Sequence, residues 1–260
     1  MRRISVVNQK GGVGKTTSAL NIAHAFALSG KRVMLIDADP QGHLSASFGL
    51  KELGLKGTDE VLMKEGSLEA LKLEIRDNLF LLAAGDKLGE LEFLSQGGAS
   101  RGYRLQRAID AVEGEYDYVI IDCPPSAGMI GMNCILAAEE LLIPVSSDFL
   151  SLHGLSRLMG IIDYIENALS IETKKWITIT RFQERRLLAR EVRKKLIENY
   201  PDTVLKTPIR ETVVIAESPG HGQSIFDYRP RSKGAEDYRS LAHDIECRNV
   251  FGSLREVEVA

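Results

Sequence analysis

Short apolar runs alternate along the chain with longer segments of helical character. Most of these runs lack strict polar and apolar alternation, which is typical of strands covered by helices on both faces. The predicted strands are Ile4–Val7, Val33–Ile36, Leu79–Ala83, Tyr118–Ile121, Leu141–Val145, Ile177–Ile179 and Val204–Leu205. The predicted helices are Lys15–Leu28, Tyr103–Val112, Gly128–Ala138, Leu150–Leu169, Glu184–Asn199 and Lys233–Cys247. This alternation of strands and helices predicts an α/β fold. The expected architecture is a single-domain, doubly wound, mostly parallel sheet with helices on both faces.

One domain is expected over residues 1–247, followed by a flexible C-terminal tail over residues 248–260. No linker-like Pro/Ser tract or internal repeat divides the 260 residues, and residues 49–77 predict no clear element. No stretch approaches the ~18 to 20 apolar residues of a membrane span, and the first strand leaves no room for a signal peptide. A cytoplasmic protein is therefore expected.

Three cysteines, Cys123, Cys134 and Cys247, lack CxxC spacing, so neither a disulfide framework nor a structural zinc site is indicated. Buried thiols are expected. Cys123 lies beside an acidic motif, but no histidine is near it in sequence, which favours packing over catalysis.

Residues 10–17, KGGVGKTT, follow directly on the first predicted strand and open the first predicted helix. In such a loop the glycines let backbone N–H groups point inward, the lysine at position 15 reaches the β and γ phosphates, and the threonine at position 16 offers its hydroxyl to Mg²⁺. A glycine-rich turn that binds nothing is disfavoured, because strand, loop and helix occur together. The predicted nucleotide-binding residues here are Lys10, Gly11, Gly12, Val13, Gly14, Lys15, Thr16 and Thr17.

Two acidic motifs follow predicted strands, where ligands of open α/β sheets bind. Asp37 and Asp39 end the second strand, and their spacing on an extended chain places them on one face. One carboxylate could hold Mg²⁺ through water while the other orients the attacking water, although a structural capping role fits Asp37 equally well. Asp122 ends the run YVIIDCPP, the form of a Walker B strand, and predicts a second acceptor for a water on Mg²⁺.

The additional lysine, Lys10, distinguishes this loop from an ordinary P-loop. The sequence KGGVGKTT resembles the deviant Walker A box of the ParA/MinD superfamily, and a resemblance to ParA/Soj-type partition ATPases extends along nearly the whole chain. The resemblance implies that Lys10 crosses a dimer interface to the partner's nucleotide. It also implies catalytic roles for Lys10, Lys15 and Asp39, with Thr16, Asp37 and Asp122 around the metal.

Residues Thr207–Ala242 resemble the C-terminal part of ParA/Soj proteins, in which this segment passes over the adenine. The resemblance implies base contacts by Pro208, Arg210 and Glu211. Many relatives have Pro-Arg-Asn where this chain has Arg210, Glu211 and Thr212, and a basic residue used for DNA at the place of Val214. The adenine contacts therefore depart from the family pattern.

A local basic cluster contrasts with the formal net charge of −3. At helical spacing, positions 186, 190, 193 and 194 lie near one stripe, which suits contact with a phosphate backbone without base readout. A solvated helix face is the alternative. The predicted DNA-binding residues are Arg181, Arg185, Arg186, Arg190, Arg193 and Lys194.

The resemblance implies a slow, partner-stimulated ATPase that dimerises with ATP and Mg²⁺, binds non-specific double-stranded DNA on the nucleoid, and drives chromosome or plasmid partition with a ParB-like protein. A MinD-like ATPase at a membrane or polar apparatus is the first alternative. Val250, Phe251 and Leu254 could form a small apolar face, but Glu256 and Glu258 oppose anionic lipid, so no membrane binding is expected. A weakly hydrolysing, ATP-regulated adaptor is the second.

Overall fold

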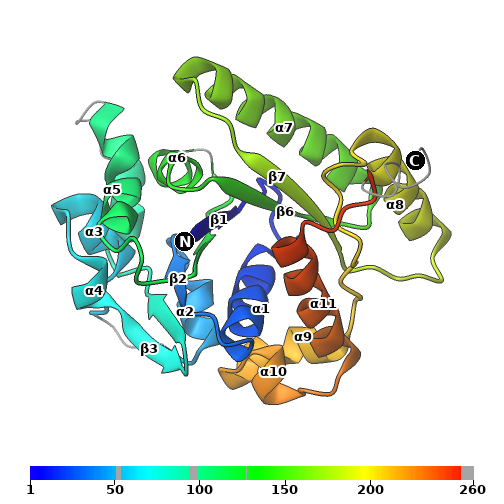
Figure 1. Ribbon diagram of the computed structural model, residues 1–260, viewed down its shortest axis with the longest axis horizontal. Helices are drawn as coiled ribbons and strands as arrows, with labels where there is room; N and C mark the ends of the chain where they lie inside the picture. The colour runs from blue at the N-terminus through cyan, green and yellow to red at the C-terminus, as the bar shows by residue number, and fades with distance from the viewer. Residues whose placement is uncertain (51–53, 94–98, 127, 253–260) are drawn as a thin grey trace.

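The computed structural model describes residues 1–50, 54–93, 99–126 and 128–252. Its centre is a seven-stranded sheet in the order β3-β4-β2-β5-β1-β6-β7, drawn in Figure 1. The strands are β1 Arg2–Val6, β2 Val33–Asp37, β3 Leu73–Arg76, β4 Leu79–Leu82, β5 Tyr118–Asp122, β6 Glu140–Ser146 and β7 Lys174–Thr180. All neighbouring strands pair in parallel except β3 and β4, which are antiparallel. The predicted doubly wound, mostly parallel sheet is confirmed.

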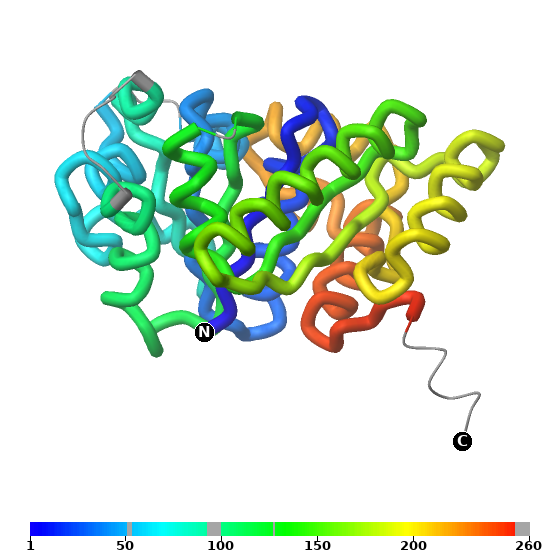
Figure 2. The backbone as a smooth tube through the Cα atoms, turned by 90° about the horizontal axis from the view of Figure 1, so that it is seen from above, coloured from blue at the N-terminus to red at the C-terminus, as the bar shows by residue number. Residues whose placement is uncertain are grey.

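Helices cover both faces of this sheet. They are α1 Lys15–Leu28, α2 His43–Ser47, α3 Thr58–Lys64, α4 Leu68–Leu71, α5 Arg104–Asp110, α6 Met129–Leu136, α7 Phe149–Leu169, α8 Leu187–Asn199, α9 Val213–Glu217, α10 Ile225–Tyr228 and α11 Lys233–Cys247, with 3-10 turns η1 Leu88–Phe93, η2 Ala99–Tyr103 and η3 Ser218–His221. Helices α1, α2, α10 and α11 pack on one face, and α3 to α8 on the other. Helices α7 and α8 lie side by side (Figure 2).

Two hydrophobic clusters fill the spaces between the sheet and its helical layers. Successive residues of one strand point to opposite clusters, as Leu35 and Ile36 do in β2 and Ile120 and Ile121 do in β5. Burial on both faces explains why these strands read as continuous apolar runs.

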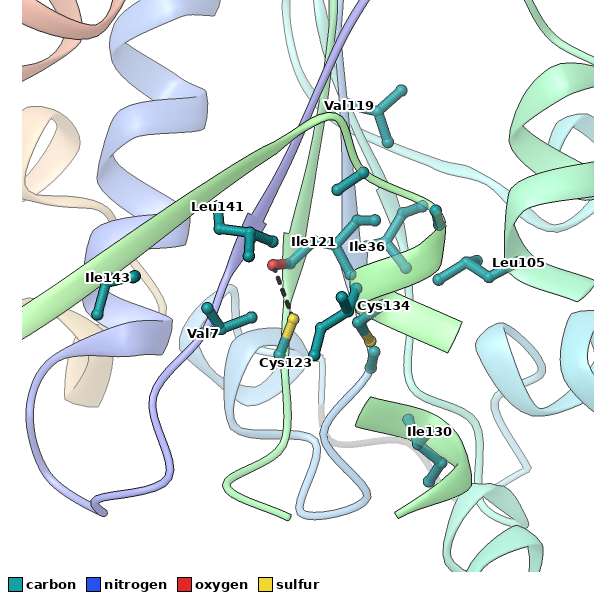
Figure 3. Close-up of a cluster of buried hydrophobic side chains, with 14 of the residues drawn as sticks. Val7, Ile36, Leu105, Val119, Ile121, Cys123, Ile130, Cys134, Leu141 and Ile143 are labelled. Atoms are coloured by element: carbon teal, nitrogen blue, oxygen red, sulfur yellow. Dashed lines mark hydrogen bonds between the residues drawn. The ribbon is translucent and has the colours of Figure 1, made fainter. Parts of the chain in front are cut away.

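The cysteines divide between core and surface. Cys123 and Cys134 lie within one apolar cluster (Figure 3), where the Cys123 thiol donates to the Ile121 carbonyl oxygen at 3.7 Å. A hydrogen bond with the neighbouring Cys123 thiol, together with burial, raises the pKa of Cys134 well above its ordinary value. Such thiols are packing groups rather than nucleophiles. The expectation of a buried thiol is wrong for Cys247, which is exposed at the end of α11.

The chain beyond α11 does not leave the domain at residue 248. Val250 is buried and forms an antiparallel bridge with Leu205, while the Gly252 N–H donates to the Pro201 carbonyl oxygen at 2.8 Å. The predicted flexible tail is therefore corrected over residues 248–252, because their backbone groups find partners in the preceding loop. Residues 253–260, the rest of that predicted tail, lie outside the described residues.

Candidate functional site

The loop over residues 10–17 adopts the shape predicted for phosphate binding. Gly12 and Gly14 have φ values of 74° and 89°, a left-handed conformation that side-chain-bearing residues rarely adopt. Gly14 caps the N-terminus of α1, and Thr180 at the end of β7 donates its hydroxyl to the Val13 carbonyl oxygen at 2.8 Å. A Cβ atom at Gly11 or Gly12 would meet nothing within 4 Å, so the space around these glycines is open to a ligand.

Two cavities meet at this loop. The larger, about 690 Å³, is lined by the loop, by Asp39 and by residues of α2 and η3. The smaller, about 190 Å³, is lined by β7, the segment 209–212, α9 and α11. Gly12, Gly14 and Thr17 line both cavities. The larger is called the phosphate cavity below, because it contains Lys15 and Thr16, and the smaller is called the base cavity.

The larger cavity holds three of the predicted catalytic and metal-binding residues. Lys15 and Thr16 line it from the first turn of α1, and Asp39 lines it from the loop after β2. Lys15 is 8% exposed and lies where the helix N-terminus directs its unpaired N–H groups. The Asp39 carboxylate accepts the Gln41 N–H at 3.0 Å, which orients it at the cavity wall.

Asp122 lies at the end of β5, directly opposite Asp37 in the parallel register, and like Asp37 it does not line the cavity itself. It is fully buried, and neither of its carboxylate oxygens has a hydrogen-bond partner among the described residues. Burial raises the pKa of Asp122 well above its ordinary value, and the Asp37 carboxylate adds to this, while Thr16 and Lys15 oppose it. A buried unpartnered carboxylate beside the Thr16 side chain fits a hydrogen bond to water on Mg²⁺.

Asp37 takes the structural role that sequence reasoning left open. One carboxylate oxygen accepts the Ser45 N–H and hydroxyl at 2.8 and 2.7 Å, and the other accepts the Asp39 N–H at 3.2 Å. Burial raises the pKa of Asp37 to about 6 despite these hydrogen bonds. Asp37 is fully buried, and its carboxylate holds α2 beside the site, while its place around the metal stays a prediction.

Replacement of Asp122 by asparagine is expected to stabilise the nucleotide-free protein by about 1–3 kcal/mol, because it removes a buried carboxylate without a partner. In the unfolded chain the pKa of the Asp122 carboxyl is near 3.8, and in the folded protein this pKa is higher. The free energy of unfolding of the wild type therefore falls as the pH rises between these two pKa values. The gain should therefore be largest at high pH and disappear at low pH. Urea unfolding at several pH values measures it, with the exposed Asp163→Asn as control. A destabilised Asp122→Asn protein at pH 8 would contradict the assignment.

The Lys10 side chain does not line the phosphate cavity, because its ammonium group is bound by other residues of the same chain. Its Nζ donates to both oxygens of Asp148 at 2.7 and 2.8 Å and to the Ser151 hydroxyl at 2.9 Å. Burial alone would raise the pKa of Asp148, but hydrogen bonds from Lys10, Ser146 and Ser151 outweigh it and lower the pKa to about 2. Lys10 is 35% exposed at its side chain, so its ammonium group is held at the surface.

The smaller cavity has an apolar floor and a polar rim. Ile209, Ile215 and the buried Tyr238 form the floor, which suits the flat face of a base. Glu211 lies on the rim. Arg210 also lies there, but its guanidinium is bound to both oxygens of Asp237 at 2.6 to 3.0 Å, so it anchors the segment to α11.

Two predicted residues of this region are placed differently. Pro208 does not line the cavity, because the chain turns into it only from Ile209 onward. Arg181 lies on the rim beside the phosphate loop, where its guanidinium donates to the Gly12 carbonyl oxygen at 3.4 Å and pairs with Glu211 at 3.2 Å. These contacts place the Arg181 side chain at the nucleotide cavity, and its DNA binding stays a prediction.

The remaining basic cluster lies on α8 and the turn before it. Arg185, Arg186, Arg190 and Lys194 are exposed. Arg193 is only partly exposed, and its guanidinium lies 5.7 Å from the Phe182 ring centroid and 5.5 Å from that of Phe251. Arg193 therefore contacts the chain end, and its DNA binding stays a prediction.

Several cavity residues were not predicted from the sequence. Gln41, His43 and Ser47 from α2 and its preceding turn line the phosphate cavity, as do Pro219 and Gly220 from η3. Gln41 and His43 follow directly after the acidic motif, so their place at this cavity could have been predicted from the sequence. The η3 residues arrive from far along the chain, and only the tertiary fold brings them there.

Comparisons with known proteins agree with this geometry. A family model described as an AAA domain matches residues 1–175. The chain is 35% identical to the sporulation initiation inhibitor protein Soj of Bacillus subtilis, covering 93% of this chain and 97% of Soj. It is 35% identical to the chromosome partitioning protein ParA of Myxococcus xanthus, covering 98% and 91%.

Solved structures share the fold, and several of them contain bound nucleotides. Cobyrinic Acid a,c-diamide synthase from Mycobacterium smegmatis, with bound ADP and magnesium, is 31% identical with a TM-score of 0.80 over 94% of both chains. The cell division ATPase MinD of Pyrococcus furiosus, 24% identical with a TM-score of 0.75 over 95% of this chain and 99% of MinD, shows the same fold. Within the described residues, no helix is long and apolar enough to cross a membrane.

Proposed function

The chain belongs to the ParA/Soj family of P-loop ATPases, and from this membership we propose that it is an ATP-dependent dimerising switch that binds non-specific DNA in its ATP form. With a ParB-like partner it drives chromosome or plasmid partition, or positions another cargo on DNA. It works in the cytoplasm on the nucleoid. Its substrate is ATP and its metal is Mg²⁺, in keeping with the ADP and magnesium bound by the Mycobacterium smegmatis structure.

One observation carries the nucleotide assignment: two cavities meet at the glycines of residues 10–17, one lined by Lys15, Thr16 and Asp39 and the other with an apolar floor. Backbone N–H groups of this loop and Lys15 bind the phosphates. Thr16 and Asp122 hold Mg²⁺, which neutralises charge on the phosphates when bound. Asp39, oriented by the Gln41 N–H, positions the attacking water at the cavity wall.

The proposed dimer depends on Lys10. Its ammonium group lies at the surface beside the phosphate loop rather than inside its own phosphate cavity, which suits a role on the nucleotide of a second subunit. There it would stabilise negative charge on the phosphates in the transition state. Hydrolysis then releases a phosphate from the nucleotide that Lys10 contacts in the second subunit, and the dimer dissociates.

The exposed basic side chains of α8 are proposed to contact DNA. Arg186, Arg190 and Lys194 recur at intervals of four residues, while Ala189, Val192 and Leu196 of the same helix are buried. This basic stripe therefore faces away from the core, as contact with a phosphate backbone requires. Dimerisation joins two such stripes into a bivalent surface, so DNA binding depends on ATP.

Replacing Arg190 and Lys194 by glutamate is expected to weaken binding of the ATP form to any duplex, irrespective of sequence. The slope of log affinity against log salt should fall by about two for each subunit, because two phosphate contacts are lost. Biolayer titrations across salt concentrations measure this. The Lys87→Glu/Arg231→Glu variant changes net charge equally at exposed positions elsewhere and serves as control. Equal losses in both variants, or ATP-independent binding, would argue against this DNA surface.

The described part of the C-terminal segment does not favour membrane binding. Val250 is buried, and Phe251 packs against the hydrophobic core beneath Arg193. Neither side chain is available to enter a lipid surface. Leu254, Glu256 and Glu258 lie outside the described residues.

The hydrolysis step is proposed to be slow alone and accelerated by DNA together with the ParB-like partner. Steady-state phosphate release with and without these two components tests this. A rate that stays near background in all conditions would favour the adaptor alternative.

A further inference from the structure

Arg181, Gln183 and Glu211 form a connected polar strap at the rim of the smaller cavity. The Arg181 guanidinium donates to the Gly12 carbonyl oxygen at 3.4 Å and to a Glu211 carboxylate oxygen at 3.2 Å. The Gln183 amide donates to the other Glu211 oxygen. The strap thus joins the phosphate loop to the segment 209–212, two lining elements of this cavity.

The fold does not require these side chains. Arg181 is 59% and Glu211 36% exposed at the side chain, so removing either leaves no hole in the core. The backbone of the segment has its own support, because the Glu211 N–H donates to the Phe182 carbonyl oxygen at 3.1 Å and Arg210 is anchored by Asp237. The contacts among the three side chains therefore call for a role other than stability.

The backbone of Arg181 supports such a role. Its φ of 52° is in the left-handed region, which costs a residue with a Cβ atom roughly 1 kcal/mol or more. The Ser147 hydroxyl donates to the Arg181 carbonyl oxygen at 2.9 Å and helps to hold this conformation. The strained backbone places the guanidinium beside the phosphate loop, and hydrogen bonds from Gln183 and Arg181 lower the pKa of Glu211, which keeps its carboxylate charged.

We propose that Arg181, Gln183 and Glu211 act as a latch over the base of the bound nucleotide and slow its release. The inference rests on the proposed ATP binding and concerns only the rim of the base cavity. Phosphate contacts from residues 10–17 determine whether a nucleotide binds, and the latch determines how long the base stays. The three residues are positioning residues, because they act by closing the cavity rather than on the reacting phosphates.

The test is the dissociation rate of a fluorescent ADP analogue from the full-length protein, measured by displacement with excess ADP. Arg181→Ala and Glu211→Ala should each release the analogue about two- to fivefold faster, as expected for an exposed charge pair. Arg181→Glu should be at least as fast, and the exchanged pair Arg181→Glu/Glu211→Arg should restore slow release. The exposed Arg231→Ala is the control and should match the wild type.

Two further measurements separate the latch from other roles. The thermal unfolding temperature of the nucleotide-free variants should not change, which distinguishes a latch from a structural contact. Affinity for inorganic tripolyphosphate should also stay constant, because this ligand has no base. Normal binding of the analogue with unchanged release rates in both alanine variants would overturn the latch alone. Absence of binding of either ligand to the wild type would overturn the proposed function and the latch with it.

Discussion

Replacing Lys15 by alanine is expected to cause a large loss of affinity for ATP. Lys15 is 8% exposed in the first turn of α1, where it lines the phosphate cavity together with Thr16 and Asp39. Truncating one member of a buried, hydrogen-bonded charge pair costs about 2–5 kcal/mol, or roughly a 30- to 5,000-fold loss of affinity. Calorimetric titration with ATP and Mg²⁺ measures the effect, with the exposed Lys64→Ala as control.

The Lys10→Ala variant should behave differently, because Lys10 does not line the phosphate cavity of its own chain. It should keep much of its ATP affinity and lose the ATP-dependent dimer. Size-exclusion chromatography with light scattering distinguishes the two lysines. A Lys10→Ala protein that still dimerises with ATP would rule out the crossing lysine.

Replacing Asp39 by alanine should leave ATP bound but stop its hydrolysis, so that the dimer accumulates. The Asp39 carboxylate lines the phosphate cavity, whereas the oxygens of Asp37 are engaged by Ser45 and the Asp39 N–H. A group that positions and activates water contributes about 10²- to 10⁴-fold to such a rate. Phosphate release under single-turnover conditions measures the loss, and light scattering measures the trapped dimer.

The isosteric Asp39→Asn variant provides the matched comparison, since it keeps the shape of the side chain and removes its charge. It should be as slow as Asp39→Ala if the carboxylate acts on water. Hydrolysis at the wild-type rate in both variants would transfer this role to Asp122 or to a backbone group.

The sequence predicted the central elements closely, because each combines an apolar run with a clear boundary signal. The bounds of α1 and α11 coincide with the predicted Lys15–Leu28 and Lys233–Cys247, since Gly14 and Ser232 cap their N-termini. The edge strand β3 was not predicted, because its alternation of apolar and polar residues spans only 4 residues, all of them at least partly exposed. Val204–Leu205, predicted as a strand, forms only isolated bridges to Ile177 and Val250.

The phosphate loop could be predicted because its chemistry is local: the residues that bind are consecutive in sequence. At the rim of the base cavity the family resemblance indicated Arg210 and Glu211, but nothing in the sequence indicated Arg181, which follows β7 and reaches this rim only in the fold. Arg181 and Arg193 were predicted to contact DNA from the local cluster of basic residues. Such a cluster does not indicate which acidic or aromatic groups the side chains contact. Glu211 for Arg181, and Phe182 with Phe251 for Arg193, are contacts that only the fold creates.

The contact between Lys10 and Asp148 has a consequence for the concentration at which subunits assemble. If Lys10 crosses to the partner's nucleotide, each subunit must first give up the ion pair and the hydrogen bond to Ser151. The apparent affinity between subunits then falls with the fraction of molecules whose lysine is released. The Asp148 carboxylate at the start of α7 therefore affects the subunit concentration at which the dimer forms. Substitutions at position 148 would change that concentration without changing the nucleotide cavities.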